Sequence, residues 1–186
     1  NNHEWQKTTA VLTTIFQDRD VYFTRVTHTP DTLSFNALKK FDVIVSNWNY
    51  WPDTSFRMSS RWEDVLLRFV EEGGGVVVFH AGATSFYGWD AYHQIGIGRW
   101  GKETHHGMPT LARVSPGQEH PVSRDMQDFY ILDEIWEDAE IYPGATVIGY
   151  LSATDETDRH PVKEPALFVN QVGKGRSFYT ILGHDE

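Results

Sequence analysis

One run of ten residues, from Gly73 to Gly82, constrains the fold of this chain more than any other: GGGVVVFHAG. The glycines are typical of the end of a helix, because glycine readily adopts positive φ. The short apolar run that follows them is typical of a strand buried on both faces. His80 stands where this strand would emerge, and ligands of open α/β sheets bind beyond the carboxyl ends of parallel strands. His80 is therefore the first candidate functional residue.

The residues before this run predict a βαβ unit. The spacing of Ser60 and Glu63 is that of a capping box, which places Ser60 at the N-cap of a helix. One apolar face then follows at helical spacing, formed by Trp62, Val65, Leu66, Phe69 and Val70. The run from Phe41 to Ser46 predicts a strand before the helix. Strand, helix, glycine turn and strand form a unit whose crossover is almost always right-handed.

Composition limits the class of protein. A chain of 186 residues is ordinarily one domain. Its formal net charge of −10 argues against nucleic acid and anionic membranes as partners, since both require a basic surface. No apolar run approaches the roughly 20 residues of a membrane span. The absence of cysteine excludes disulfides, thiolate zinc sites and cysteine nucleophiles. The sequence leaves two compartments open: the cytoplasm, or the periplasm if a signal peptide has been removed. It also leaves open whether the chain forms a homo-oligomer.

The rest of the chain predicts further elements around a long irregular connection. We expect a helix from Thr8 or Thr9 to Phe16, without a strand before it, which suggests a chain trimmed or incompletely recorded at both ends. The segment 83–121 is long enough to be functional or mobile. The last two strands are joined by a loop containing glycine, as in a hairpin. The predicted strands cover residues 21–26, 110–114, 166–171 and 177–182, and we also expect ordered structure over residues 128–136 and 146–151.

Several short motifs occur in a defined order: His80, His120-Pro121, Asp133-Glu134, Gly173-Lys174-Gly175 and Gly183-His184-Asp185. With this order the chain resembles the ThuA-like family, named for trehalose utilisation, over nearly its whole length from Asn2-His3-Glu4-Trp5 onward. The resemblance implies one domain over residues 1–186 that lacks its first strand and its C-terminal segment. It implies the three-layer, flavodoxin-like fold of class I glutamine amidotransferase-like proteins, with a mostly parallel sheet and a C-terminal β-hairpin.

The same resemblance carries implications for function. It implies carbohydrate catabolism, with trehalose, another disaccharide or a keto sugar as substrate and a sugar dehydrogenase as partner. Phe79-His80-Ala81-Gly82 stands where amidotransferase-like relatives have an elbow with a nucleophilic cysteine. Without a thiolate, amidotransferase chemistry is excluded, and the fold alone does not supply a replacement function.

Histidines are the main candidates for chemistry. The chain has nine of them, and those expected near strand ends are His3, His80, His184 and His106 or its neighbour His105. Neutral imidazole serves both as a general base and as a metal ligand. Two interpretations therefore stay open: a hydrogen-bonded polar pocket, or a divalent metal, best suited to Zn²⁺, held by His80, His106 and His184. No local HExxH motif exists, so distant residues would have to assemble such a site.

Two carboxylates follow the apolar run that ends at Leu132. Period-2 alternation predicts that only one of Asp133 and Glu134 points inward, and the longer Glu134 is preferred. Such an acid acts as a general base or orients a histidine, while an exposed pair at a strand end is the alternative. The predicted catalytic set is His80, His184, Glu134 and Asp133.

Aromatic and amide side chains indicate the ligand. Asn47, Trp48 and Trp51 follow the strand end at Ser46, and more aromatic residues follow the His80 turn. Aromatic faces beside amides suit sugar rings, although such clusters also form cores and interfaces. His120 precedes a proline and is held extended, for a loop-anchoring or a catalytic role. The predicted substrate-binding set is His3, Asn47, Trp48, Trp51, His106 and His120.

Two hypotheses for function follow. The first is a sugar-metabolising enzyme that performs hydrolysis, isomerisation or β-elimination next to a keto group. The second is a non-catalytic carbohydrate-binding or accessory domain, with a bound divalent metal as an option.

Overall fold

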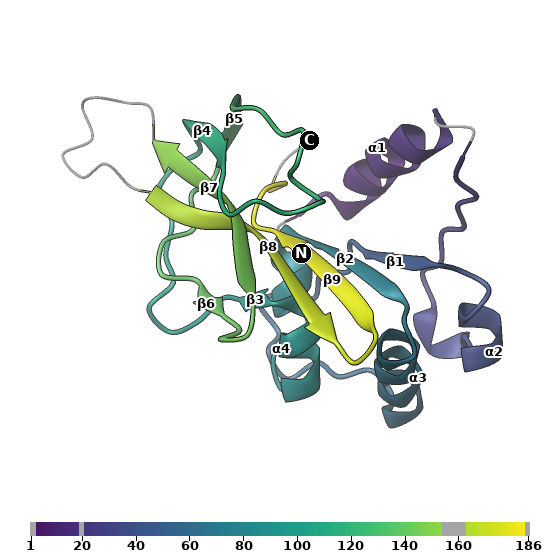
Figure 1. The fold of residues 1–186 in the computed structure, drawn as a ribbon. Coiled ribbons are helices and arrows are strands. Elements are labelled where there is room, and N and C mark those ends of the chain that lie inside the picture. Colours follow the sequence, from purple (N-terminus) through teal and green to yellow (C-terminus); the bar gives the residue numbers. More distant parts are fainter. Residues whose placement is uncertain (1–2, 19–20, 154–162, 185–186) are drawn as a thin grey trace.

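The computed structural model describes residues 3–18, 21–153 and 163–184, so Asn2 and Asp185 of the sequence motifs lie outside the described residues. A seven-stranded mixed sheet forms its centre, in the order β1-β2-β9-β8-β7-β4-β5 (Figure 1). The strands of this sheet are β1 (Val43–Ser46), β2 (Gly75–Phe79), β4 (Thr110–Pro116), β5 (Phe129–Asp133), β7 (Thr146–Ala153), β8 (Lys163–Val172) and β9 (Gly175–Thr180). The two-stranded sheet comprises β3 (Gly98–Arg99) and β6 (Glu140–Ile141). The helices are α1 (Trp5–Gln17), α2 (Phe35–Leu38), α3 (Ser60–Glu71), α4 (Asp90–Gly96) and the 3₁₀-helices η1 (Pro30–Thr32) and η2 (His80–Thr84).

The predicted βαβ unit is present. Strands β1 and β2 pair in parallel, with Ile44 opposite Val76, and α3 lies between them in the sequence. Helix α3 buries its apolar stripe in the core and ends before Gly73, whose φ of 123° is the positive value expected there. His80 therefore follows directly on a strand of the parallel part of the sheet.

The N-cap of α3 lies one residue earlier than the sequence predicted. The hydroxyl of Ser59, not Ser60, accepts a hydrogen bond of 3.3 Å from the backbone N–H of Trp62. Glu63 does not complete a capping box. Its carboxylate is drawn away by the guanidinium of Arg57, at distances of 2.6 and 2.5 Å.

The prediction of an α/β fold is confirmed, but the expectation of a mostly parallel sheet is wrong. The pairs β1–β2 and β2–β9 are parallel, whereas β9–β8, β8–β7, β7–β4 and β4–β5 are antiparallel. The reason is connection length: Gly173 and Lys174 alone join β8 to β9, and a parallel crossover needs about a dozen residues. Strands β8 and β9 do pair antiparallel across this short loop, but β9 lies between β2 and β8, so the pair is part of the central sheet and not an addition to it.

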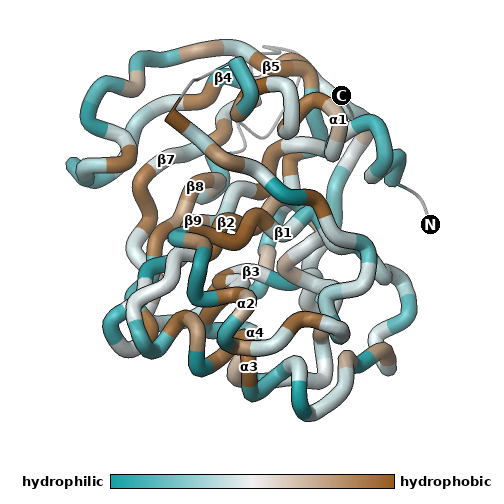
Figure 2. The backbone as a smooth tube through the Cα atoms, turned by 90° about the vertical axis from the view of Figure 1, so that its right-hand side faces the viewer, coloured by the Kyte–Doolittle hydropathy of each residue, from teal (hydrophilic) through white to brown (hydrophobic). Residues whose placement is uncertain are grey.

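Helices α3 and α4 pack against the sheet, with α3 on β9 and α4 on β2 and β9. Figure 1 shows α3 and α4 below β2 and β9, with α1 above them, and the rotated view in Figure 2 agrees. In Figure 2 the most hydrophobic backbone segments include β2 and β9 in the middle of the molecule. Val78, Phe168 and Tyr179 are fully buried there. Among the described residues, none of the helices is long and apolar enough to cross a membrane.

Two elements near the N-terminus differ from the prediction. Helix α1 begins at Trp5, with Glu4 at the N-cap, rather than at Thr8 or Thr9. The described residues 21–26 form no strand, and Val21 and Phe23 are 79% and 84% exposed. Their β-propensity is not realised because β1, at the edge of the sheet, pairs only with β2 within the described part of the chain, and a strand without a partner is unstable.

Candidate functional site: a histidine–carboxylate cluster

His80 occupies a strained elbow at the end of β2. Its φ of 42° lies in the left-handed region, which non-glycine residues rarely adopt. The following chain turns back closely: a Cβ atom on Gly82 would lie 3.2 Å from the carbonyl oxygen of Ser46. The hydroxyl of Tyr92 holds this turn by donating a 3.0 Å hydrogen bond to the carbonyl of Gly82. Backbone strain of this kind is concentrated at functional sites.

The tautomer of His80 is set by its surroundings. Nδ1 lies 2.5 Å from the carbonyl oxygen of Ile181. A carbonyl oxygen only accepts, so Nδ1 carries the hydrogen and the lone pair of Nε2 faces the cluster. Burial of the ring, which is 3% exposed, lowers the pKa of His80 to about 3, and the bond to Ile181 opposes this shift only in part. His80 is therefore neutral near neutral pH.

Glu134 and His184 meet His80 from other parts of the chain. Glu134 follows the end of β5, and its Oε2 lies 3.2 Å from Nδ1 of His184 and 3.9 Å from Nε2 of His80. The same nitrogen of His184 is 3.3 Å from Nε2 of His80. Trp136 donates from its indole N–H to Oε2 of Glu134 at 3.3 Å. Two imidazoles and one carboxylate thus lie within 3.9 Å of one another.

Asp133 has a different place from Glu134. Its carboxylate accepts hydrogen bonds from the backbone N–H groups of Gly183 (2.8 Å), Glu134 (2.8 Å) and His184 (3.4 Å). Burial raises the pKa of Asp133, and these three bonds oppose the shift. The predicted alternation does not hold here, since both acids are buried. The alternation stops because Glu134 lies beyond the strand end, and Asp133 serves to position the chain that carries His184.

His3 completes a group of three histidines. Its ring centroid lies 4.9 Å from that of His80 and 4.7 Å from that of His184, edge to face in both cases. One ring nitrogen from each of the three residues lies within 4.8 Å of the others. His106, the member predicted from the sequence, faces Glu134 Oε1 at 3.5 Å instead, while its neighbour His105 faces Glu137 at 3.6 Å.

A row of aromatic ring contacts extends from His80 through three tryptophans. The rings of His80 and Trp136 are 4.6 Å apart, those of Trp136 and Trp100 are 5.1 Å apart, and those of Trp100 and Trp51 are 6.0 Å apart. His106 lies beside Trp100 at 5.5 Å. Trp51 was predicted from the sequence as a substrate-binding residue, whereas Trp100 and Trp136 were not. The position of Trp136, two residues after Glu134, was the one available signal.

The other predicted ligand-binding residues have structural contacts. The amide of Asn47 donates to the carbonyl of Trp5 at 3.1 Å and to the hydroxyl of Thr9 at 3.0 Å, which fixes the start of α1. Trp48 packs against the main hydrophobic core. His120 makes local contacts, accepting at Nδ1 from the backbone N–H of Val122 at 3.2 Å. The described contacts of these three residues do not join them to the histidine cluster.

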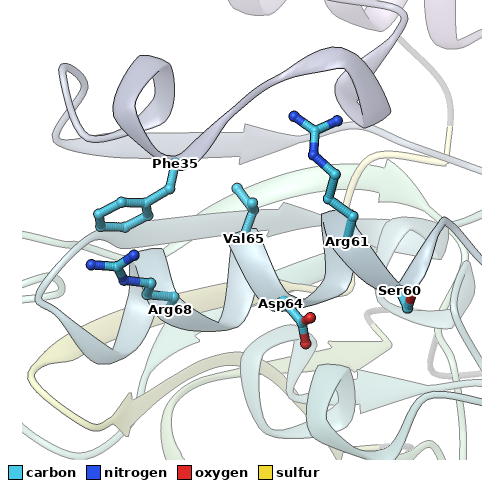
Figure 3. Close-up of a pocket in the computed structure, with 6 residues that line it drawn as sticks. All are labelled: Phe35, Ser60, Arg61, Asp64, Val65 and Arg68. Atoms are coloured by element: carbon cyan, nitrogen blue, oxygen red, sulfur yellow. The ribbon is translucent and has the colours of Figure 1, made fainter.

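Two surface depressions lie away from the cluster. An apolar groove of about 540 Å³ between α1 and β1 is lined in part by Asn47 and Trp48. A second depression of about 370 Å³ lies on α3, where Phe35 of α2 covers Arg68 (Figure 3). Its arginines are engaged, because Arg61 donates to the carbonyls of Asp31 and Leu33 and Arg68 to the carboxylate of Glu72. Neither depression brings acid–base groups together as the cluster does.

Fold and site together define a class: an α/β protein whose strand-end elbow carries histidine and opens on a carboxylate and two further histidines. The chain belongs to the ThuA family, described as trehalose utilisation, whose family model matches residues 1–186. No curated protein matches the chain.

Solved structures share the fold. A putative ThuA-like protein from Parabacteroides merdae is 22% identical, with a TM-score of 0.77 over 100% of this chain and 77% of that one. A second, from Bacteroides uniformis, is 20% identical, with a TM-score of 0.67 over 96% of this chain and 74% of that one. The GH42 β-galactosidase Gan42B from G. stearothermophilus is 18% identical, with a TM-score of 0.62 over 95% of this chain but only 23% of its own. At these identities the likeness concerns the fold alone.

Proposed function

We propose that this protein is an enzyme of carbohydrate catabolism that acts on a disaccharide or a keto-sugar derivative at His80, Glu134 and His184. The observation that carries the proposal is the convergence of these three side chains within 3.9 Å at a strained strand-end elbow. Family membership supports the substrate class. The proposal includes the flavodoxin-like, three-layer arrangement of amidotransferase-like proteins as the framework around the site.

His184 and Glu134 are suited to move a proton. The carboxylate accepts from Nδ1–H of His184, which leaves Nε2 of that ring as a base. In hydrolysis this nitrogen would take a proton from water, and in isomerisation or elimination it would take one from the carbon next to a ketone. Glu134 would then stabilise the imidazolium, as a carboxylate does for a catalytic histidine.

His80 has a complementary role in this proposal. Because burial keeps the His80 ring neutral, the ring is a weak base, but its Nε2 stays available as a hydrogen-bond acceptor. Its Nε2 lone pair can accept a hydrogen bond from a sugar hydroxyl or from His184. His106 and Trp100 flank the cluster on its more exposed side, where a sugar ring would stack.

The experiment is an activity screen with trehalose, its 3-keto derivative and simple glucosides, with products identified by NMR. Glu134→Gln and His184→Gln should each lower kcat by roughly 10²–10⁴-fold, the usual contribution of a positioned acid or base. His28→Gln, at an exposed position outside the predicted site, is the matched control and should retain wild-type turnover. Full turnover in both cluster variants would reject this catalytic site.

A carbohydrate-binding domain without turnover is the second candidate. The partly buried rings of Trp51 and Trp100 favour it, since aromatic faces bind sugars without chemistry. Saturable binding of an unchanged sugar, equal in wild type and Glu134→Gln, would favour this function over the enzyme.

A further inference from the structure

We infer that His3, His80 and His184 bind a divalent cation, best matched by Zn²⁺, with a fourth position open to water or a sugar oxygen beside Glu134. The inference shares its residues with the proposed catalytic site, but it stands on their geometry and is tested without turnover.

The spacing of the nitrogen atoms fits a tetrahedral ion. Zn–N bonds of 2.0–2.1 Å place neighbouring ligand nitrogens about 3.3 Å apart in a tetrahedron. Nε2 of His80 and Nδ1 of His184 are 3.3 Å apart. As a ligand, Nδ1 of His184 carries no hydrogen, so metal binding requires the tautomer with the hydrogen on Nε2 and replaces the bond from Nδ1–H to Glu134 proposed for the metal-free protein. His3 offers a third nitrogen, and the three ligand atoms lie within 4.8 Å of one another.

The hydrogen bonds around His80 and His184 resemble those that orient metal-binding histidines in other proteins. A metal-bound histidine usually donates its other ring N–H to a carbonyl or carboxylate, which directs the lone pair at the metal. His80 does so, because its Nδ1–H bonds to the carbonyl of Ile181 and leaves Nε2 facing His184. Asp133 holds the backbone of Gly183 and His184. The ring of His80 is therefore oriented in advance, and the backbone that carries His184 is fixed in place.

Glu134 lies beside the fourth position. Its Oε2 is 3.2 Å from Nδ1 of His184 and 3.9 Å from Nε2 of His80, and the indole of Trp136 holds it there. A carboxylate in this place can accept a proton from metal-bound water or a sugar hydroxyl. Three nitrogen donors with an open position are typical of catalytic zinc sites.

His106 is not a member of this metal site, in contrast to the set expected from the sequence. Its Nδ1 lies 2.7 Å from the carbonyl oxygen of Gly107 and 3.5 Å from Oε1 of Glu134. The ring thus faces the outer side of the carboxylate. His3, from the segment before α1, takes the place expected for His106.

The test uses the 186-residue chain after removal of metal by a chelator. Zn²⁺ is added, the protein is dialysed, and the metal content is measured by elemental analysis. We expect one zinc per chain, and a fall to less than a tenth of that in His3→Gln, His80→Asn and His184→Gln. The control His28→Gln should retain the zinc. Zinc should raise Tm in the wild type and the control only, because binding to the native state stabilises it.

Several results would overturn the site. These are a zinc content near zero in the wild type, equal uptake by the His80→Asn/His184→Gln double variant, or Co²⁺-loaded wild type without the visible absorption of a tetrahedral ion. The Co²⁺ measurement needs no variant, so it stays decisive if the variants fold poorly. A zinc content near zero together with turnover of a tested sugar would reject the metal site and retain the proposed enzyme. Bound zinc without turnover of any tested sugar would support the metal site and count against the proposed enzyme.

Discussion

The carboxylate of Asp133 accepts a 2.8 Å hydrogen bond from the backbone N–H of Gly183, fifty residues further along the chain. This bond ties the end of β5 to the segment that follows β9, although the two strands lie far apart in the sheet order. With the N–H groups of Glu134 and His184 also bound, Asp133 sets where His184 stands relative to Glu134. Asp133 is therefore a positioning residue.

Asp133→Asn should lower the free energy of unfolding by about 1–3 kcal/mol, because an amide nitrogen cannot accept from a buried N–H group. The measurement is urea unfolding. Asp128→Asn is the matched control, since Asp128 forms a surface ion pair with Arg113, and it should cost no more than about 1 kcal/mol. Equal costs for the two variants would contradict the positioning role. NMR signals of His184 should also shift in Asp133→Asn.

Ser59→Ala should lower the free energy of unfolding by about 1 kcal/mol, the usual cost of losing an N-cap. The hydroxyl of Ser59 accepts from the N–H of Trp62 and donates to Asp31 at 2.7 Å. Ser60→Ala, one residue on, should stay within about 0.5 kcal/mol of the wild type. Thermal or urea unfolding of both variants is sufficient. A larger loss of unfolding free energy in Ser60→Ala than in Ser59→Ala would support Ser60 as the N-cap, as the sequence predicted.

Trp100→Ala should weaken sugar binding, raising KM or Kd by roughly 3- to 10-fold, as expected for the loss of about 0.5–1.5 kcal/mol of aromatic stacking. Trp100 lies between Trp51 and Trp136 and beside His106. Trp48 and Trp100 both pack against the main core, so both variants should lower Tm, but Trp48→Ala should leave sugar binding unchanged. Calorimetric titration and thermal unfolding separate the two effects. Weaker binding in Trp48→Ala alone would move the ligand away from the cluster.

His93→Gln should make stability less sensitive to pH between 7.5 and 5.5. Burial, reinforced by the charge of Arg99, lowers the pKa of His93, while the carbonyl and charge of Glu140 and the charge of Asp90 oppose the shift. The unfolded chain, with a histidine pKa near about 6.5, therefore takes up a proton that the native state resists. Stability from neutral His93 is full above that value and is lost as pH falls below it. An unfolding free-energy difference between wild type and variant that is equal at both pH values would contradict this.

Local patterns were sufficient for the central βαβ unit. The apolar stripe from Trp62 to Val70, the glycines after it and the run before His80 each specify a conformation through neighbouring residues. Helix α3, strands β1 and β2 and the elbow histidine follow from them. The strand expected at residues 21–26 failed for the opposite reason, because a strand needs a partner that its own sequence cannot supply.

In the site, too, some features follow from local sequence and others from the packing of the whole chain. The sequence by itself determined that His80, Glu134 and His184 stand at strand ends, and that no thiolate chemistry is available. Only the tertiary structure decided that His3 rather than His106 joins the three histidines, that Asp133 binds backbone N–H groups, and that Trp100 and Trp136 flank the cluster. The physical reason is that local conformation depends on residues a few positions apart. The distances between these side chains depend on how β2, β5 and β9 align in one sheet, which the packing of the whole chain sets.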